Sequence, residues 1–334
     1  EEPQSEVLFV GTERGLEARM LPELGWELKT IEMSGFAGLG LSARLKAMMK
    51  LVVGFGQSRK ILREFRPDVV VGVGGYASAP VLLAAKILGV PYLIHEQNAW
   101  PGQANRLFGR WARRVCLSLI EADRAFHAAA TIVTGNPVRA EMEQCPRIDT
   151  TGKPCLLIFG GSQGARAINQ TVVAALSHLQ EWRGQLQIIH QTGEAACKEV
   201  EAAYQQAGWS DVTVTPFIKD MAAAYGRSTL VLCRAGATTL AELTACGRPA
   251  LLIPFPQAAG NHQSLNAQAM AAKGAALMME QKNLTAETLA QLLNDLLRDS
   301  ERLQSMAAAA NNLAKPGAAA RLLKECRTVL EEAA

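Results

Sequence analysis

The stretch PCLLIFGGSQGARAINQ, residues 154–170, joins an apolar run to a glycine-rich turn and then to a helical pattern. An apolar run bounded by turn residues is typical of a strand buried on both faces of a parallel sheet. Glycines after such a strand let the backbone approach a phosphate closely, and a helix beginning near Ser162 directs free N–H groups toward negative charge. No GK[ST] sequence follows, so this is not a Walker A loop. The stretch predicts an α/β unit with an anion-binding turn or, without a ligand, a tight structural turn.

Further strands and helices alternate on both sides of this stretch. Apolar runs predict strands over residues 7–10, 68–73, 91–95, 131–135, 186–191, 212–217, 229–233 and 249–255. Helical patterns lie between them, notably over residues 41–65 and 79–88, and only helical patterns follow residue 284. Such alternation predicts parallel sheets with right-handed crossovers, covered on both faces by helices. We therefore predict an α/β protein of two doubly wound parallel-sheet domains.

The domain boundary is predicted from length and from proline placement. A chain of 334 residues exceeds what one hydrophobic core usually serves, and prolines with a polar stretch interrupt the pattern between Pro137 and Pro154. The predicted parts are an N-terminal domain over 1–137, a linker over 138–153, a C-terminal domain over 154–316 and a final helix over 317–334 that packs back toward the N-terminal domain.

Cysteine and histidine usage gives a second set of expectations. The 7 cysteines are scattered without a CxxC pair, and the 5 histidines form no metal-ligand spacing. We therefore expect reduced thiols, a cytosolic compartment, no metal site and no cofactor. No apolar run reaches the roughly 18 residues that a membrane-spanning helix needs.

Positive charge is concentrated in the first half of the chain. Residues 44–66 carry seven Lys or Arg against one acid, and residues 100–114 carry four arginines and no acid. Apolar side chains accompany both windows, namely Leu41, Leu45, Met48, Met49, Val52 and Val53 in the first and Trp100, Leu107, Phe108 and Trp111 in the second. An apolar stripe ringed by basic residues favours contact with an anionic membrane surface through 41–66 and 100–114, over a merely solvated helix face. Nothing in the sequence indicates base recognition, so nucleic-acid binding is not expected.

Three more glycine or amide clusters follow predicted strands. They are VGVGGYASAP (71–80), CRAGATTLAEL (233–243) and FPQAAGNHQSLNA (255–267). Glu242, just inside a predicted helix, suits a vicinal diol such as a ribose, and neutral amides near His262 suit sugar hydroxyls. Each cluster also has an interpretation that needs no ligand. The glycine turn of 71–80 would then be structural, Glu242 would be a surface residue that interacts with the helix dipole, and the amides of 255–267 would cap a helix.

Taken in order, GGYASAP, HEQN, GNPVR, GGSQGARAIN, PFIKDM, CRAGATTLAE and NHQSLNA make the chain resemble the MurG family of GT-B glycosyltransferases over nearly its whole length. That family transfers N-acetylglucosamine from UDP-N-acetylglucosamine to lipid I, the undecaprenyl-diphosphate-linked acceptor, with inversion and without a metal, giving lipid II for peptidoglycan. The resemblance implies two Rossmann-like domains facing a cleft and a peripheral position at the cytoplasmic face of the bacterial inner membrane.

The resemblance also implies which residues bind the two substrates. The implied contacts with UDP-N-acetylglucosamine are Asn98, Arg139, Ser162, Ile218, Ala237, Thr238, Thr239, Leu240, Ala241, Glu242, His262 and Gln263. The implied contacts with the lipid acceptor are Gly74, Gly75, Tyr76 and His95.

One family feature has no counterpart in the sequence. Family members open with a strand and a GGTGGH-type loop whose histidine is a proposed catalytic base. That unit is absent from the sequence, and we expect that the sequence is truncated at its start. The catalytic base is therefore unassigned, with His95 and Glu96 as the nearest substitutes. The alternatives are another GT-B glycolipid glycosyltransferase, a UDP-sugar epimerase or a non-catalytic membrane adaptor. A nicotinamide enzyme is disfavoured because no GxGxxG with a later acid follows a strand.

Overall fold

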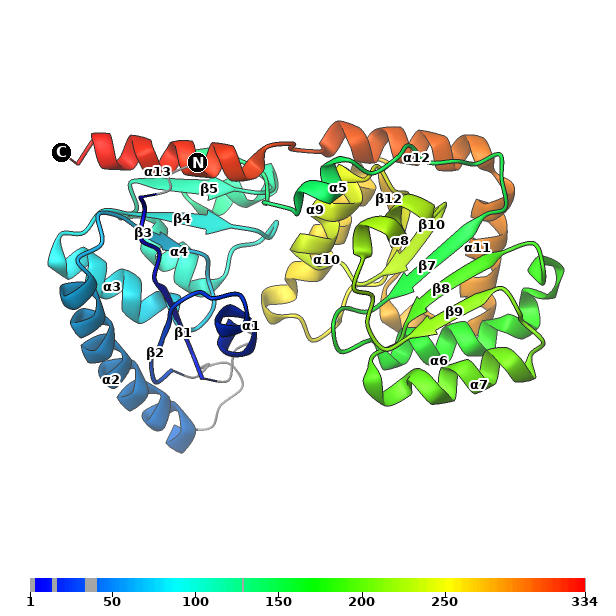
Figure 1. The fold of residues 1–334 in the computed structure, drawn as a ribbon, viewed down its shortest axis with the longest axis horizontal. Coiled ribbons are helices and arrows are strands. Elements are labelled where there is room, and N and C mark those ends of the chain that lie inside the picture. The colour runs from blue at the N-terminus through cyan, green and yellow to red at the C-terminus, as the bar shows by residue number, and fades with distance from the viewer. Residues whose placement is uncertain (1–3, 14–16, 34–40, 128, 334) are drawn as a thin grey trace. The chain divides into compact units, whose positions relative to one another are not determined.

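The computed structural model describes residues 4–13, 17–33, 41–127 and 129–333, and the chain forms two compact units (Figure 1). Unit 1 comprises Glu1–Gln97, Pro101–Thr134 and Ala320–Ala334, and unit 2 comprises Asn98–Trp100 and Gly135–Ala319. Each unit is an α/β body with parallel sheets, as the alternation of strand and helix patterns predicts.

Unit 1 is built on a four-stranded parallel sheet in the order β3-β4-β5-β6. Its strands are β3 (Val70–Gly72), β4 (Tyr92–Glu96), β5 (Arg114–Leu117) and β6 (Thr131–Val133). The helices of this unit are α1 (Glu17–Glu23), α2 (Leu41–Phe65), α3 (Ser78–Leu88), α4 (Gln103–Gly109), the 3-10 helix η1 (Ile120–Ala125) and α13 (Ala318–Glu331). The bounds of α2 match the predicted helix over 41–65, because its apolar residues recur at helical spacing without an interior proline.

Two features of unit 1 differ from the predicted strands. The first strand, β1 (Phe9–Gly11), pairs with β2 (Leu28–Thr30) in a separate two-stranded sheet. Strand β5 escaped prediction because arginine opens it and only Val115, Cys116 and Leu117 form its apolar run.

The C-terminal helix α13 belongs to unit 1, although it is last in the sequence. Its Val329 is fully buried against Leu93 of β4 and Cys116 of β5. Arg114 of β5 pairs with Glu325 of α13 at 3.6 Å and also with Glu332. A buried apolar contact flanked by ion pairs thus fixes α13 on this sheet.

None of the helices in the described residues combines the length and the apolar composition that spanning a bilayer requires.

Unit 2 contains a six-stranded parallel sheet in the order β12-β11-β10-β7-β8-β9. The strands are β7 (Cys155–Phe159), β8 (Gln187–Gln191), β9 (Val212–Thr215), β10 (Leu230–Cys233), β11 (Ala250–Leu252) and β12 (Ala276–Met278). The chain adds β8 and β9 on one side of β7 and then returns to add β10, β11 and β12 on the other side. The direction in which successive strands are added therefore reverses between β7 and β10, although all six strands are parallel. This is the strand order of a doubly wound dinucleotide-binding domain.

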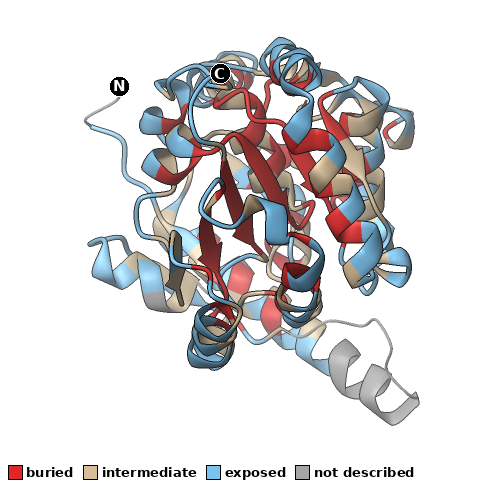
Figure 2. Ribbon diagram, turned by 90° about the vertical axis from the view of Figure 1, so that its right-hand side faces the viewer, coloured by how far each residue is buried: buried red, intermediate tan, exposed pale blue. Residues whose placement is uncertain are grey.

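Helices cover this sheet, so its inner strands β7, β8, β10 and β11 are nearly inaccessible to solvent, whereas the edge strands β9 and β12 are only partly buried (Figure 2). The helices are α5 (Ala140–Glu143), α6 (Arg166–Ala175), α7 (Cys197–Gln206), α8 (Met221–Arg227), α9 (Ala237–Ala245), α10 (His262–Ala272), α11 (Ala286–Arg298) and α12 (Ser300–Leu313). All five residues of β7 are buried, as a two-sided parallel strand requires. Strand β12 was not predicted, because the apolar run AALMM is equally typical of the end of a helix.

The predicted linker over 138–153 is partly structured. It contains the short helix α5, whose Met142 is completely buried within unit 2. A single apolar residue among acids gave no periodic signal, which is why the sequence suggested only a polar connection.

The expectation of reduced thiols is wrong for two cysteines. Cys145, which follows α5, and Cys246, which follows α9, form a disulfide across a sequence separation of 101 residues. The other five cysteines are free. Sequence spacing could not reveal this pair, because only the fold brings the two positions together.

Protein purified without reductant and then denatured is predicted to expose five reactive thiols, and seven after reduction. Since a disulfide limits the freedom of the unfolded chain, Cys145→Ser should lower the free energy of unfolding by about 2–4 kcal/mol under non-reducing conditions. Thiol titration and urea unfolding measure the two effects. Cys197→Ser, which alters a free thiol, is the control, and seven thiols before reduction would contradict the prediction.

Candidate functional site

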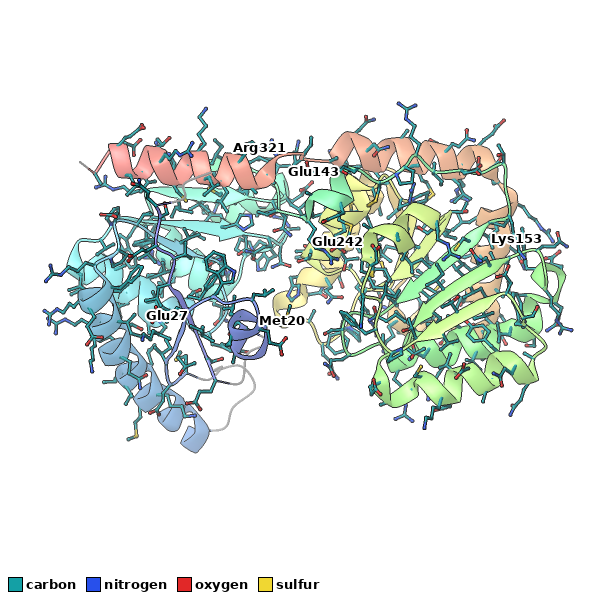
Figure 3. All side chains as sticks on the ribbon, viewed as in Figure 1. Met20, Glu27, Glu143, Lys153, Glu242 and Arg321 are labelled. Atoms are coloured by element: carbon teal, nitrogen blue, oxygen red, sulfur yellow. A yellow bond between two sulfur atoms is a disulfide. The ribbon has the colours of Figure 1, made fainter. Side chains whose placement is uncertain are left out.

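The candidate site of unit 2 lies at the carboxyl ends of β7 and β10, where the strand order reverses. Helices leave the two strands toward opposite faces at such a point, so backbone N–H groups are left uncovered there. Lys153, just before β7, and Glu242, beyond the end of β10, lie at opposite ends of unit 2 (Figure 3). The glycine turns that follow β7 and β10 are thus at the same edge of the sheet.

The turn after β7 is compact and glycine-dependent. Gly161 and Gly164 have φ values of 96° and 73°, a region that side-chain-bearing residues rarely adopt. A Cβ atom on Gly164 would overlap the carbonyl of Thr192. The following helix begins at Arg166 rather than near Ser162, so the predicted start was four residues too early. Ser162 instead lies exposed in the turn itself.

A buried amide ties this turn to the segment after β9. Gln191 ends β8 with 3% exposure, and its Nε2 donates to the carbonyl of Gly161 at 2.8 Å. Its Oε1 accepts from the backbone N–H of Ile218 at 3.3 Å. Gln191 therefore fixes the spacing between the turn at Ser162 and the backbone of Ile218, two of the predicted donor contacts.

The turn after β10 leads directly into α9. Gly236 is the N-cap and supplies no side chain, so the first N–H groups of the nine-residue α9 have no side-chain cap. Thr238 is exposed, whereas Leu240 is 2% exposed and lies in the core. Of the predicted contacts over 237–241, the threonine hydroxyls and backbone amides are available to a ligand, while the Leu240 side chain serves packing.

Glu242 is the charged group at the centre of this site. Its side chain is 15% exposed, and its Oε1 lies 4.0 Å from Nη2 of Arg139, which is 56% exposed. The hydroxyl of Tyr225 donates to Oε2 at 3.1 Å. Burial raises the pKa of Glu242, and the Tyr225 hydrogen bond and the Arg139 charge oppose that rise. The site thus holds a partly desolvated carboxyl group with one oxygen directed inward and one toward the surface.

Asn98, another predicted position, is joined to the turn after β10 by Asn266 of α10. Its completely buried side chain accepts from the N–H of Ala99 at 2.8 Å and donates to Oδ1 of Asn98 at 3.1 Å. The same Nδ2 donates to the carbonyl of Ala235 at 3.1 Å. Asn98 is therefore held beside the turn after β10.

The remaining predicted donor contacts, His262 and Gln263, begin α10. Nδ1 of His262 lies 2.7 Å from the carbonyl of Ala259, so Nδ1 carries the proton and Nε2 is left for another partner. Oε1 of Gln263 accepts from the N–H of Phe255 at 2.9 Å, which leaves its amide hydrogens for a ligand. Both side chains are anchored at one end.

Beneath the glycine turn lies a buried polar network. His190 is completely buried, with Nδ1 3.1 Å from the Tyr204 hydroxyl and Nε2 3.1 Å from Oδ1 of Asn169. Asn169 in turn donates to the carbonyl of Thr192 at 2.9 Å. Burial lowers the pKa of His190 to about 3. A neutral histidine therefore supports the strand end on which the turn rests.

The predicted acceptor residues all belong to unit 1. Gly74 and Gly75 have φ values of 87° and 81°, and Tyr76 is 59% exposed beside them. His95 is instead 3% exposed, with Nδ1 3.1 Å from Nε2 of Gln97 and Nε2 3.2 Å from the Ser118 hydroxyl. Direct contact of His95 with an acceptor stays a prediction.

Glu96, the other substitute base considered, is also buried. Its carboxylate accepts from Nδ2 of Asn105 at 2.8 Å and from the N–H of Gly102 at 3.2 Å. Asn105 lies against Gly74. In this structure Glu96 thus supports the loop containing Gly74 and the start of α4.

The basic windows divide into exposed and internal parts. Side chains of residues 41–48, including Leu41, Leu45 and Met48, lie outside the described residues. Met49, Val52 and Val53 of α2 are exposed, and so are Leu107 and Trp111. Phe108 is 4% exposed and belongs to the core, which corrects its assignment to an outward apolar stripe. Arg114, the last residue of the second window, forms an ion pair with Glu325.

Sequence reasoning missed Tyr225, Gln191 and Asn105. Gln191 carried a usable signal, because an amide at the end of a buried apolar strand needs a hydrogen-bonding partner. Tyr225, in AAAYGR, carried none, since its relation to Glu242 depends on tertiary packing. Among the described residues, no group of three or more His, Cys, Asp or Glu side chains could hold a metal ion.

Comparisons with known proteins agree across the whole chain. Residues 155–322 match the glycosyltransferase family 28 C-terminal domain, and residues 1–117 match the N-terminal domain of the same family. The chain is 57% identical, over 98% of its length and 92% of the relative's, to the UDP-N-acetylglucosamine--N-acetylmuramyl-(pentapeptide) pyrophosphoryl-undecaprenol N-acetylglucosamine transferase of Syntrophotalea carbinolica.

Two solved structures are also similar. The crystal structure of Acinetobacter baumannii MurG matches with a TM-score of 0.78 and 32% identity, covering 98% of this chain and 92% of that chain. The UDP-GlcNAc 2-epimerase of Neisseria meningitidis matches with a TM-score of 0.60 and 15% identity, covering 97% of this chain and all of that chain, and shares the fold alone.

The buried His190 predicts a pH-dependent stability. Its pKa is depressed in the folded state, to about 3, so the unfolded chain binds more protons below the ordinary pKa near 6.5. The free energy of unfolding should therefore fall as the pH drops below that value, by up to about 1.4 kcal/mol per pH unit from this group. Urea unfolding at pH 7, 6 and 5 measures the slope.

His190→Gln should have a shallower slope than the wild type, because glutamine does not titrate. His127→Gln changes an exposed side chain and should keep the wild-type slope. Equal slopes in the wild type and His190→Gln would contradict the assignment.

Proposed function

This chain belongs to glycosyltransferase family 28, and we propose that it transfers N-acetylglucosamine from UDP-N-acetylglucosamine to the muramyl sugar of lipid I, giving lipid II. The observation that carries this proposal is 57% identity over 98% of the chain to a relative named for that reaction. The likeness to UDP-GlcNAc 2-epimerases is confined to the fold, so it does not favour epimerisation.

The proposed donor site is the carboxyl edge of the unit 2 sheet. Glu242 would accept hydrogen bonds from the ribose diol, and the backbone of Ile218 would meet the uracil. Ser162 and the uncapped start of α9 at Ala237 would lie along the diphosphate. This assignment is supported by the N–H groups at that helix start, which have no side-chain cap, and by the glycine turn after β7. Sugar hydroxyls would bind the free end of Gln263.

The chemistry follows from charge development on the leaving group. The acceptor 4-hydroxyl attacks the anomeric carbon, the glycosidic bond to the diphosphate breaks, and the configuration inverts. UDP departs with increased negative charge, which the N–H groups at the start of α9 stabilise best when that charge is greatest. A base takes the proton of the attacking hydroxyl, and no described residue is assigned that role.

We also propose that unit 1 contacts an anionic membrane, at the cytoplasmic face, where the lipid acceptor resides. The support is a patch formed by Lys86 and Ile87 of α3 with Leu107, Arg110 and Trp111 at α4. Ile87, Leu107 and Trp111 are each more than 40% exposed. Nζ of Lys86 lies 3.2 Å from the Trp111 ring centroid, and the Arg110 guanidinium carbon lies 5.0 Å from it. An amphipathic ring between two cations suits the lipid headgroup region.

Glu242→Gln is predicted to lower kcat/KM for UDP-N-acetylglucosamine by about 10- to 100-fold, because hydrogen bonds to a charged acceptor contribute about 1.5–3 kcal/mol. Steady-state kinetics with lipid I or a soluble analogue measures the effect. The control Glu199→Gln removes an exposed carboxylate on α7 and should leave the kinetics unchanged. Normal donor kinetics in Glu242→Gln would refute the donor site.

Lys86→Glu is predicted to weaken binding to phosphatidylglycerol vesicles by about tenfold or more, since each cation near such a surface contributes about 1 kcal/mol and reversal adds repulsion. Vesicle co-sedimentation measures binding, with phosphatidylcholine vesicles for comparison. The matched control Lys273→Glu reverses an exposed charge in unit 2. Equal losses in both variants, or no preference for anionic vesicles, would overturn the membrane proposal.

A further inference from the structure

We propose that Tyr225 is a positioning residue that fixes the Glu242 carboxylate for recognition of the donor's ribose and thereby sets selectivity against 2′-deoxyribonucleotides. The proposal rests on the donor site proposed above. It adds a residue that does not touch the nucleotide and acts only through Glu242. Tyr225 lies on α8, outside every motif that the sequence brought to attention.

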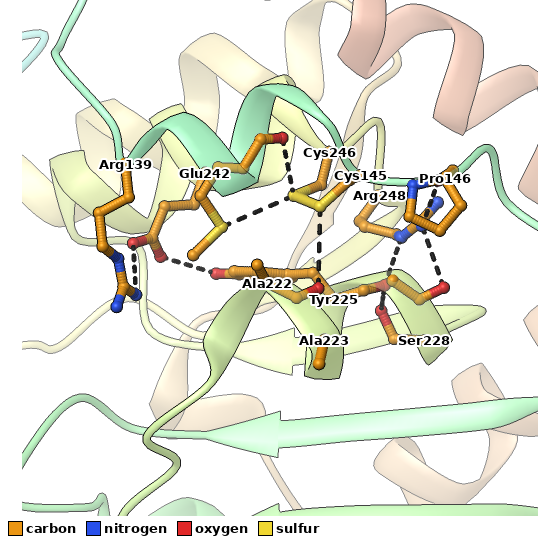
Figure 4. The surroundings of a disulfide bond; sticks show 12 residues. Arg139, Cys145, Pro146, Ala222, Ala223, Tyr225, Ser228, Glu242, Cys246 and Arg248 are labelled. Carbon is orange, nitrogen blue, oxygen red and sulfur yellow. Dashed lines mark hydrogen bonds and ion pairs between the residues drawn. A yellow bond between two sulfur atoms is a disulfide. The ribbon is translucent and has the colours of Figure 1, made fainter.

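Tyr225 is held in a single position by its surroundings. Its side chain is completely buried, and its ring meets Phe159 of β7 edge-on, with centroids 6.0 Å apart. Its carbonyl accepts from Nε of Arg248 at 2.6 Å and from the Ser228 hydroxyl at 2.9 Å. Figure 4 shows Tyr225 with Arg248 and Ser228 beside the Cys145–Cys246 disulfide. A hydroxyl supported in this way is a preorganised donor.

The Tyr225 hydroxyl selects one orientation of the Glu242 carboxyl group. It donates to Oε2 from the interior, while Arg139 lies 4.0 Å from Oε1 on the exposed side. A vicinal diol requires both carboxylate oxygens at a defined angle, each with a free lone pair. Without Tyr225, the carboxylate can turn toward the exposed Arg139 and lose that angle. The Tyr225 hydrogen bond thus preserves a diol-binding geometry that Arg139 alone would not maintain.

The charge state of Glu242 depends on the same contact. The groups that face it are Arg139 at the N-cap of α5, Tyr225 from α8 and the buried thiol of Cys233 from β10. Burial raises the pKa of Glu242, and the Tyr225 hydrogen bond is the first influence that lowers it. Removing the hydroxyl should therefore raise this pKa further. Because the ribose is bound by the carboxylate, nucleotide affinity should then begin to fall at a higher pH than in the wild type.

The test compares UDP with 2′-deoxy-UDP by calorimetry of the full chain between pH 5.5 and pH 8. In the wild type, UDP should bind more tightly than 2′-deoxy-UDP. The ratio measured is the dissociation constant of 2′-deoxy-UDP divided by that of UDP. Tyr225→Phe should reduce this ratio by about tenfold, the upper range for one hydrogen bond. The pH at which UDP affinity falls should also rise. In Glu242→Gln the two nucleotides should bind equally well, so that the ratio is about one. Adding Tyr225→Phe to Glu242→Gln should not change the ratio further.

Two controls separate positioning from general stability. Tyr92→Phe in unit 1 removes another buried hydroxyl, one that donates to the Phe108 carbonyl at 2.9 Å, and should keep the wild-type ratio and pH dependence. Replacing Tyr225 with 3-fluorotyrosine retains the ring and strengthens the donor, so the fall in affinity should move to lower pH.

The outcomes distinguish this inference from the function on which it rests. If Glu242→Gln abolishes the ratio while Tyr225→Phe keeps the wild-type ratio and pH dependence, the positioning role is wrong and the donor site stands. If Glu242→Gln keeps the wild-type ratio, the donor site itself is wrong, and the positioning role fails with it.

Discussion

The candidate donor site depends on the reversal of strand order between β7 and β10 in unit 2. Parallel strands that carry helices to opposite faces leave the carboxyl ends of the two central strands uncovered. The turns after these strands, at Gly160–Gly164 and Arg234–Gly236, are therefore the positions where backbone amides can face a ligand. The candidate donor site of unit 2 is a consequence of where the strand order reverses.

That edge is supported by buried polar groups rather than by apolar packing alone. Asn169, Gln191 and Asn266 each donate to backbone carbonyls of the turns or of neighbouring segments, and the buried His190 holds Asn169 in place. Burying such groups is costly unless every hydrogen bond is made. A network that meets this condition has few alternative arrangements, so it fixes the turns more precisely than interchangeable aliphatic contacts would. Rigid turns are what electrostatic stabilisation of a departing diphosphate requires, because no reorganisation is then needed during the reaction.

The sequence predicted the elements whose signals are local. Long apolar runs such as Cys155–Phe159 and the periodic helix Leu41–Phe65 were recognised, and so was the position of Glu242 beyond a glycine turn. Two strands of the large sheets were missed, because β5 opens with arginine and the apolar run of β12 is equally typical of a helix end. The helix after the glycine turn was predicted too early, since Ser162 resembles an N-cap while the turn continues to Ala165.

The contacts that relate distant segments gave no local signal at all. Cys145 and Cys246 are separated by 101 residues, and neither position differs in spacing from the free cysteines. Tyr225 and Glu242 are on different helices, and only the packing of α8 against β7 turns the phenol toward the carboxylate. Motifs thus predict candidate ligand-binding groups, because turns and helix starts have sequence signatures. Groups that orient them are chosen by packing, so a structure is needed to find them. A buried tyrosine whose hydroxyl meets a half-buried carboxylate illustrates why: either side chain alone is ordinary, and only their contact gives the carboxylate a fixed direction.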